Sequence, residues 1–257
     1  MERLPFDPHK PMKKNTRDDP KSDRAFTRLE LVMIVATLVL LAGVALPLLA
    51  GSKQVSERTV CFSNLRQMGH AFHLWANDHG DRNPWITPVG EGGTFGSLNP
   101  IKNNAWWQMQ SISNELVTPK ILVCPSDLLA GDLRKMASDF SITNFNGGFA
   151  ALPFRNNALS YIIGLHSVCS APRSILSGDR NLTFDGINGS CATGVGDASV
   201  FSDPSSSAGW TNAIHGTSGD LLFTDGGVEN LSTTGLRRAV NIPNQVDNGQ
   251  HHFLAPY

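Results

Sequence analysis

The sequence predicts an α+β fold in which a long N-terminal helix packs against an antiparallel sheet. The first observation behind this is an uncharged, mostly apolar segment of 22 residues, Leu31 to Ser52. The second is a stripe of apolar residues at helical spacing between Cys61 and Trp75. The third is the change after Gly80 to short apolar runs separated by Gly, Asn, Ser and Pro, which is typical of strands joined by turns.

Composition excludes few classes of protein, because it is ordinary for a globular chain of 257 residues with a formal net charge of -1. That near-neutral charge gives no electrostatic reason to expect nucleic acid as a partner. The charge is unevenly placed, however. Residues 1–25 carry seven Lys or Arg and five Asp or Glu, whereas charges are absent from Leu31 to Ser52.

The apolar segment has the length of a transmembrane helix, since 22 residues at 1.5 Å each span roughly the 30 Å hydrocarbon core of a bilayer. A secretory signal peptide would have a shorter apolar region ending at a small-residue cleavage site. The alternative is a helix buried in a globular core. The basic leader indicates an N-terminus in the cytoplasm, so we expect a single-pass protein of the bacterial inner membrane whose C-terminal domain is periplasmic.

The start of this segment carries a recognisable motif: basic residues, a small residue, Phe, Thr and then a glutamate before the apolar run. The residues are Lys21, Arg24, Ala25, Phe26, Thr27 and Glu30. They resemble the class III signal of type IV prepilins and type II secretion pseudopilins. The resemblance implies cleavage between Ala25 and Phe26 by a prepilin peptidase and N-methylation of Phe26. Two positions depart from the pattern, because Ala25 replaces the usual Gly and Arg28 occupies an ordinarily apolar position.

Glu30 and Pro47 are the two residues of the apolar helix with an expected special role. An ionisable group at membrane depth needs a partner, and the resemblance implies that Glu30 pairs with the Phe26 amine of a neighbouring subunit. The alternative is that Glu30 reaches the lipid headgroups. Pro47 should kink the helix, because it frees the carbonyl of Gly43. It lies twenty-two residues into the mature chain, the position of a proline in type IV pilins.

We therefore expect three parts: a cytoplasmic leader peptide at 1–25, a transmembrane helix at 26–52, and a periplasmic pilin-like globular domain at 53–257. The domain includes the second half of the long helix, which should end between Asn77 and Gly80. The expected fold is thus pilin-like, a long N-terminal transmembrane helix packed on an antiparallel β-sheet head.

Within the head, we expect a short helix from Asn103 or Asn104 and a brief strand at 121–125. Further strands are expected in 159–168 and 173–182, followed by a Gly- and Ser-rich loop at 183–211. Residues 219–231 predict a hairpin around Asp-Gly-Gly.

A second resemblance lies in the head, where His215 is followed after nine residues by Asp225 and Gly226. This H-x9-DG motif is similar to that of large pseudopilin-like proteins abundant in planctomycetes and verrucomicrobia. The segments "CFSNLRQMGHAFHLWANDHGDRNPW", "CPSD" and "SGDRN" are similar to other recurrent segments of that group.

The four cysteines are Cys61, Cys124, Cys169 and Cys191, and an oxidising compartment would favour disulfides among them. Four cysteines allow three connectivities. We favour Cys61 with Cys124, which would tie the helix to the sheet, and Cys169 with Cys191, which would close the loop. Free buried thiols are the alternative.

The sequence gives little support for catalysis, and we expect no enzyme. His215, Asp220 and Asp225 are conceivable as a triad or metal cluster, and His70, His73 and His79 as ligands on the helix. No common catalytic or nucleotide-binding motif accompanies them. An Asp-Gly pair is more often a turn device.

We expect no cofactor, with calcium as a possibility, because hard oxygen ligands suit this ion. The alternative is that the acids are simply solvated. The loop-like acids are Asp179, Asp185, Asp197, Asp203, Asp220 and Asp225.

Two functions follow from these features. The first is a pseudopilin-like structural subunit of a type II secretion or type IV pilus-like filament. The partners that the resemblance implies are the prepilin peptidase, other pseudopilin subunits, a platform protein, an assembly ATPase, a secretin and membrane lipid. The alternative is a membrane-anchored periplasmic binding module for a secreted substrate or polysaccharide. Its candidate contacts are tryptophans that core packing would equally explain, namely Trp85, Trp106, Trp107 and Trp210. A third function, that of an anchored periplasmic enzyme, has less support.

Overall fold

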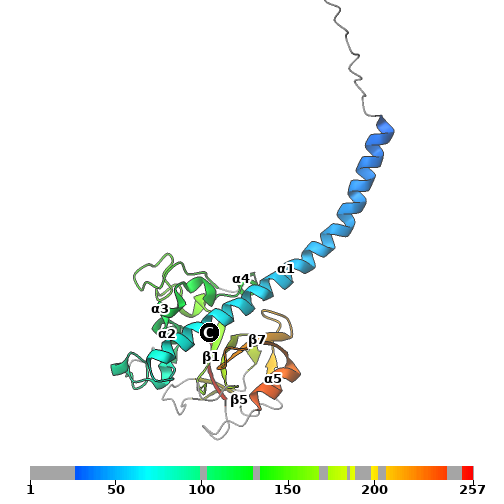
Figure 1. Cartoon of the computed structure of the whole chain (residues 1–257). Coiled ribbons are helices and arrows are strands. Elements are labelled where there is room, and N and C mark those ends of the chain that lie inside the picture. The colour runs from blue at the N-terminus through cyan, green and yellow to red at the C-terminus, as the bar shows by residue number, and fades with distance from the viewer. Residues whose placement is uncertain are drawn as a thin grey trace, which may run out of the picture. The chain divides into compact units, whose positions relative to one another are not determined.

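A computed structural model provides the structure, shown in Figure 1. It describes residues 27–98, 103–129, 134–167, 173–183, 186–188, 198–201, 207–241 and 251–256, without the side chains of 45–54, 186–188 and 198–201. The chain divides into two compact units, residues 1–49 and residues 50–257.

Helix α1, Arg28–Asp78, begins at a capping box formed by Thr27 and Glu30. The backbone N–H of Thr27 donates to Glu30 Oε2 at 2.9 Å, and the backbone N–H of Glu30 donates to Thr27 Oγ1 at 3.2 Å. Each side chain thus satisfies a backbone donor that the first turn of a helix leaves unpaired. This local role for Glu30 was not predicted from the sequence.

The predicted membrane span is contradicted. In the described part of the chain, no helix meets the length and apolarity that crossing a bilayer requires. The assignment of 26–52 as a transmembrane helix is therefore wrong, and so is the single-pass inner-membrane localisation derived from it.

Several predicted features of the N-terminal region fall on residues or side chains outside the described set. Ala25 and Phe26, the predicted processing site, lie outside the described residues together with the 1–25 leader. Pro47 lies within α1, but its side chain is outside the described set.

The head is built on a seven-stranded antiparallel sheet in the order β4-β5-β9-β1-β2-β7-β8, and its strands and helices are seen in Figure 1. The antiparallel sheet that the turn-rich sequence predicted is confirmed. The strands are β1 Tyr161–Gly164, β2 Ile175–Asp179, β4 Gly186–Asn188, β5 Ala198–Phe201, β7 Ser218–Phe223, β8 Val228–Ser232 and β9 His251–Leu254. Strands β3 Leu182–Thr183 and β6 Gly209–Trp210 form a separate pair.

The central strands are buried on both faces, because side chains alternate between two apolar clusters. Tyr161 and Ile163 of β1 belong to the cluster that contains α1, whereas Ile162 between them belongs to the other cluster. The second cluster packs under α5, Thr233–Val240. This period of two follows from strand geometry, and burial on both sides explains why these strands are almost continuously apolar.

The second half of α1 lies against the sheet through the stripe that the sequence predicted. Its members are all buried, at 4% exposure or less: Cys61, Leu65, Met68, Phe72 and Trp75. The helix approaches the sheet so closely at Gly69 that an added Cβ would lie 2.9 Å from a methyl of Leu222. The Cys61–Cys124 disulfide joins the same helix to the residue that precedes Pro125. This confirms the predicted pair. Cys169 and Cys191 lie outside the described residues.

The segment between the helix and the sheet is helical, which confirms one prediction and corrects another. Helices α2, Ala105–Ser111, and α3, Ser113–Leu116, occupy the expected helical region. The expected strand at 121–125 is absent: a 3-10 turn, η4 Pro119–Leu122, precedes α4, Pro125–Leu129. A proline stands at the first position of each, where its missing N–H and fixed φ favour helical turns.

The remaining expectations for the head are mostly confirmed. Strands β1 and β2 lie in the predicted segments, and β7 and β8 form the predicted hairpin. The expected loop at 183–211 is wrong in part, since it contains β4, β5 and β6. Strand β9 near the C-terminus was not foreseen at all, although it pairs with both β1 and β5.

The disulfide should contribute measurably to the stability of the head. Replacing both Cys61 and Cys124 with Ala removes the cross-link between α1 and α4, which should lower the free energy of unfolding by about 2 to 4 kcal/mol. Urea unfolding followed by circular dichroism measures this. Reductant should lower the stability of the wild type by breaking this disulfide. It should have no such effect on the double variant, which lacks the bond. Equal unfolding midpoints for the oxidised wild type and the variant would contradict the prediction.

Candidate functional site

The head segments singled out in the sequence converge around the disulfide, at the place where α1 meets the sheet. Cys61 lies in α1, and its disulfide partner Cys124 immediately precedes α4. Asp179 is the last residue of β2, and His215 lies in the loop between β6 and β7. Asp220 lies in β7. Segments far apart in sequence thus bring one disulfide and three ionisable groups together.

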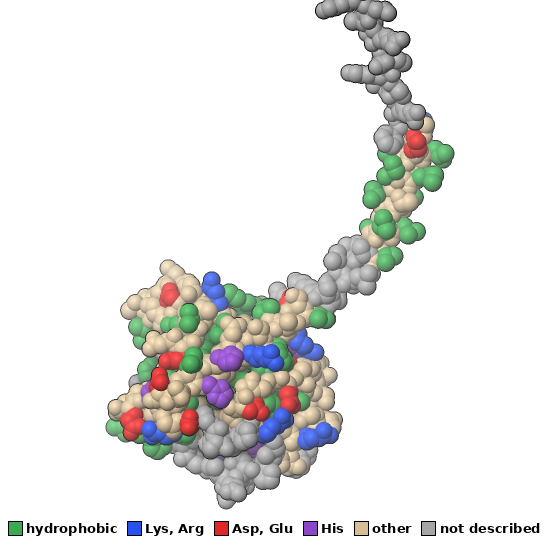
Figure 2. Space-filling model, in the orientation of Figure 1, with side chains coloured by type: hydrophobic (Ala, Val, Ile, Leu, Met, Phe, Trp, Pro, Cys, Tyr) green, Lys and Arg blue, Asp and Glu red, His purple; other side chains and the backbone are tan. Residues whose placement is uncertain are grey.

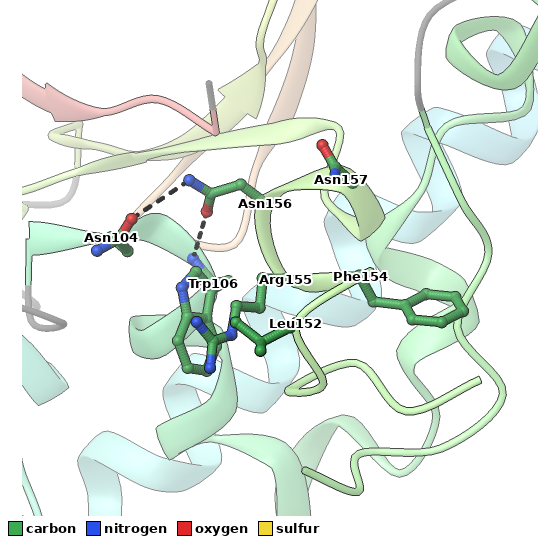
Figure 3. Close-up of a pocket in the computed structure, with 7 residues that line it drawn as sticks. All are labelled: Asn104, Trp106, Leu152, Phe154, Arg155, Asn156 and Asn157. Carbon is green, nitrogen blue, oxygen red and sulfur yellow. Dashed lines mark hydrogen bonds between the residues drawn. The ribbon is translucent and has the colours of Figure 1, made fainter. Parts of the chain in front are cut away.

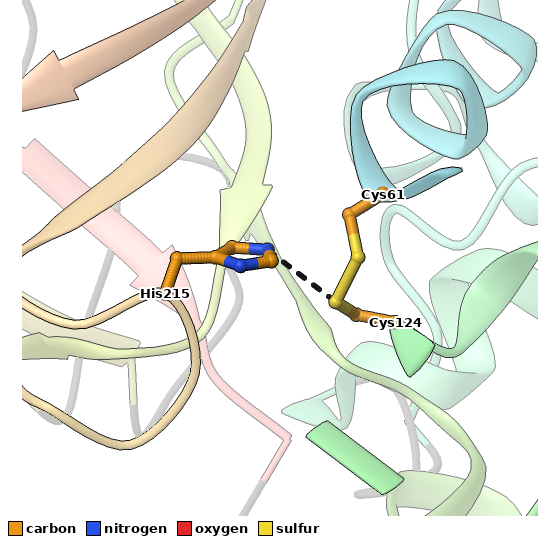
Figure 4. A group of neighbouring side chains, drawn as sticks. All are labelled: Cys61, Cys124 and His215. Atoms are coloured by element: carbon orange, nitrogen blue, oxygen red, sulfur yellow. Dashed lines mark hydrogen bonds between the residues drawn. A yellow bond between two sulfur atoms is a disulfide. The ribbon is translucent and has the colours of Figure 1, made fainter. Parts of the chain in front are cut away.

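His215 points at the disulfide, as Figure 4 shows, with its Nε2 3.4 Å from Cys124 Sγ. The same nitrogen lies 3.7 Å from Asp179 Oδ2. The His215 side chain is only 3% exposed. Burial, followed by the nearby Arg58 charge, lowers the pKa of His215 from 6.5 to about 4, so the imidazole is neutral at pH 7.

Asp179 and Asp220 are two buried carboxyls linked through the backbone. Asp179 Oδ2 accepts a 2.8 Å hydrogen bond from the Asp220 N–H, and Asp220 Oδ1 accepts one of 2.6 Å from Asn230 Nδ2. Burial raises the pKa of Asp179 well above its usual value, and the Asp220 charge adds to this. Burial likewise raises the pKa of Asp220. Together with His215, these groups offer three potential ligand atoms within 4.8 Å of one another.

A buried ion pair lies beside this cluster and connects the "CPSD" segment to the "SGDRN" segment. Arg180 donates from Nε and Nη2 to the two oxygens of Asp127, at 2.9 and 2.6 Å. Both side chains are nearly inaccessible, at 9% and 0% exposure, and Arg134 Nε lies 3.6 Å from the same carboxylate. A bidentate pair of this kind fixes orientation as well as charge.

Two further polar contacts hold the loop that carries His215. Arg58 of α1 donates to the His215 carbonyl at 2.8 Å and to Ser218 Oγ at 2.5 Å. Asn181 Nδ2 reaches the carbonyls of Thr211 and Ser218. These contacts tie α1 and the residues after β2 to the loop that carries His215.

The H-x9-DG motif divides between two places. His215 joins the buried cluster, whereas Asp225 is exposed in the β7–β8 turn and accepts a 2.8 Å hydrogen bond from the Gly227 N–H. Gly226 adopts φ 79°, a left-handed conformation that glycine takes without strain. Asp225 and Gly226 thus build the hairpin turn. The considered triad of His215, Asp220 and Asp225 is not formed. The third residue in the cluster with His215 and Asp220 is Asp179.

The other sequence-based candidates are not gathered into a site. His70 and His73 lie on the exposed side of α1, and His79 stacks on Trp75 with ring centroids 3.7 Å apart. Of the acids considered for calcium, only Asp179 and Asp220 meet among the described residues. Asp185, Asp197 and Asp203 lie outside them.

The head also contains a pocket of about 240 Å³ near α2, shown in Figure 3. Trp106 is one of the residues that line it, and the Arg155 guanidinium lies 4.7 Å from the centre of the Trp106 ring. Asn156 Oδ1 accepts a hydrogen bond of 3.2 Å from the backbone N–H of Trp106, which fixes the pocket wall. The candidate tryptophan contacts are otherwise in the core: Trp85, Trp106 and Trp210 are at most 7% exposed, and Trp107 is half-buried.

Comparisons of the chain with known protein families, with curated proteins and with solved structures found no match. The geometry around His215 is therefore the basis on which this site is assigned.

The buried ion pair should carry more stability than an exposed one. Asp127→Asn removes the charge that Arg180 faces in a buried position, and should lower the free energy of unfolding by about 3 to 5 kcal/mol. Urea unfolding at neutral pH measures this. The matched control is Glu229→Gln, which breaks the Arg173–Glu229 pair at 51% and 41% exposure and should cost under about 1 kcal/mol. Equal effects of the two substitutions would contradict the prediction.

Proposed function

We propose that this protein is a pseudopilin-like structural subunit that assembles into a type II secretion or type IV pilus-like filament through the first part of α1. The observation that supports this most directly is a set of large apolar side chains on α1 that are all at least 43% exposed. They are Leu29, Leu31, Val32, Met33, Ile34, Val35, Leu38, Val39, Leu40, Leu41 and Val44.

These side chains surround the helix instead of forming one stripe. Residues 31–35 are consecutive, and at about 100° per residue they point in every direction around the axis. Figure 2 shows apolar side chains on both sides of this stretch. A helix that is apolar all round is normally buried on all sides, so the stretch requires several neighbours.

Copies of the same helix are suitable neighbours. Each would present the same uncharged surface, and packing several together would cover it from every direction. The prepilin-like motif that immediately precedes the helix supports this kind of assembly, because the resemblance implies that such helices pack side by side in a filament.

Glu30 contributes twice in this proposal. Within its own chain it caps α1, and the hydrogen bond from the Thr27 backbone lowers its pKa, so it stays charged. In the assembly, that charge pairs with the Phe26 amine of an adjacent copy after processing at Ala25. Only one oxygen, Oε2, takes part in the hydrogen bonds to Thr27.

The partners of the proposal are those that the resemblance implies. A prepilin peptidase would process the chain, other pseudopilin subunits would surround α1, and a platform protein, an assembly ATPase and a secretin would complete the machine.

A binding role for the head is the alternative, and the pocket over Trp106 is the observation that favours it. Its Arg155, Asn104 and Asn156 side chains resemble the polar groups that bind sugars or peptides. However, the Trp106 ring is 3% exposed and already covered by Arg155. The assembly function therefore has the stronger support.

Loss of one exposed apolar residue from α1 should weaken assembly. Leu40→Asp places a charge where neighbouring helices would pack, and should reduce crosslinking between copies at least about tenfold, because burying an unpaired charge is costly. Crosslinking of the full-length protein, produced in cells that process prepilins, measures this. The control is Leu152→Asp in the head, since Leu152 is similarly exposed, at 67% against 71% for Leu40. Equal crosslinking by the Leu40 variant and the wild type would refute the proposed surface.

The two roles of Glu30 separate by substitution. Glu30→Gln keeps an oxygen that can cap the helix but removes the charge, and should lose as much crosslinking as Glu30→Ala. Thr27→Ala keeps the charge and removes the cap, at about 0.5 to 2 kcal/mol of helix stability, and should still crosslink. Mass spectrometry confirms that each variant starts at methylated Phe26. If Glu30→Gln crosslinks as well as the wild type, Glu30 acts only as a cap.

A further inference from the structure

The cluster of Asp179, His215 and Asp220 has the composition of a ligand site that the proposed function does not use. The three residues come from β2, the β6–β7 loop and β7, and their ligand atoms lie within 4.8 Å of one another. Asp179 and Asp220 are fully buried, and the His215 side chain is 3% exposed.

Each carboxylate has one oxygen satisfied and one that is not. Asp179 Oδ2 and Asp220 Oδ1 accept the hydrogen bonds described above, whereas the buried Asp179 Oδ1 and Asp220 Oδ2 have no hydrogen-bond partner among the described residues. Buried polar atoms are nearly always paired, because leaving one unpaired costs about 1 to 3 kcal/mol. Two unpaired carboxylate oxygens in one cluster indicate a missing electropositive partner.

Arg58 is the nearest candidate within the chain, but its hydrogen bonds in the described structure go elsewhere. Its Nη2 donates to the His215 carbonyl and to Ser218 Oγ. Arg58 therefore holds the loop in place and does not donate these hydrogen bonds to a carboxylate. One positive charge beside two carboxylates also leaves a net negative cluster when both are ionised.

We propose that Asp179, His215 and Asp220 bind one divalent transition-metal ion of the zinc class. Two carboxylates and one imidazole form a mixed oxygen and nitrogen set that suits Zn²⁺, at about 2.0 to 2.2 Å from each ligand. Calcium is a poorer match, since it takes six to eight oxygen ligands and rarely a nitrogen.

The surroundings resemble the outer contacts of a metal site. Asn230 donates to Asp220, the Asp220 N–H donates to Asp179, and Arg58 holds the His215 backbone. Contacts of this kind orient metal ligands and raise affinity. The loop that carries His215 is itself exposed at residues 212, 213, 216 and 217.

A second group of potential ligands also contains His215, and the experiment must distinguish it from the first group. Cys61 and Cys124 also lie near its imidazole, but sulfur binds zinc as thiolate, and these two are joined as a disulfide. Metal binding through them would require reduction. Binding through the carboxylates would not.

The test uses the full-length protein in mild detergent, stripped with EDTA and kept free of reductant. Titration with ZnCl₂ by calorimetry, together with metal analysis after gel filtration, should give one ion per chain. Asp179→Asn and Asp220→Asn should each weaken binding at least about 100-fold, the upper end of what loss of a supporting contact alone causes. Near-ultraviolet circular dichroism shows whether each variant is folded. If one of the two variants is unfolded, the other one serves as the test.

Three controls locate the ion. Asp225→Asn alters the other acid of the H-x9-DG motif, which is exposed in the turn, and should bind zinc like the wild type. A His70→Ala and His73→Ala double variant removes the exposed histidines of α1 and should also bind normally. Co²⁺ bound in place of Zn²⁺ should show no thiolate charge-transfer band.

The outcomes are decisive in both directions. One zinc ion per chain, lost in either carboxylate variant and retained in the controls, supports the site. Absence of binding overturns it. Binding that appears only after reduction, survives Asp179→Asn and shows a thiolate band with Co²⁺ also overturns it, in favour of the cysteine pair.

Discussion

The packing of the second half of α1 on the sheet is the constraint on which the rest of the head depends. The buried stripe of that helix supplies one wall of the main apolar cluster, and Gly69 allows the helix axis to approach the sheet closely. Because apolar burial is the dominant favourable term in folding, this contact sets where every neighbouring segment can lie. The Cys61–Cys124 disulfide fixes α1 at the same place.

That packed position also explains why polar chemistry gathers there. The end of β2, the start of β7 and the loop before it all meet α1 near Cys61, so Asp179, Asp220 and His215 are withdrawn from water together. Withdrawal raises the pKa of the carboxyls and lowers that of the imidazole. The neighbouring Asp127–Arg180 pair shows how the fold satisfies buried charge, with two short hydrogen bonds. The three-residue cluster lacks such pairing, and this difference singles it out.

The two units of the chain present different surfaces. In residues 50–257, the largest apolar side chains are mostly buried in two clusters, and those that remain exposed are scattered. In residues 1–49, the described part of α1 exposes nearly every large apolar side chain and has one charged residue beyond its first position, Glu30, used as a cap. An exposed apolar surface of that kind is typical of an interaction site, and it is the surface that the proposed assembly uses.

The sequence by itself determined the elements whose signals are local. The 3.6-residue spacing from Cys61 to Trp75 predicted the buried face of α1, and Asp225 and Gly226 predicted the β7–β8 hairpin through turn chemistry. The expected strand at 121–125 failed because apolar residues there obscured the helix-starting role of Pro119 and Pro125. Only the tertiary structure decided that β9 lies between β1 and β5, and that His215 meets Asp179 instead of Asp225. Such pairings depend on contacts between distant segments, and no local pattern of residues encodes which strand ends will share a buried space.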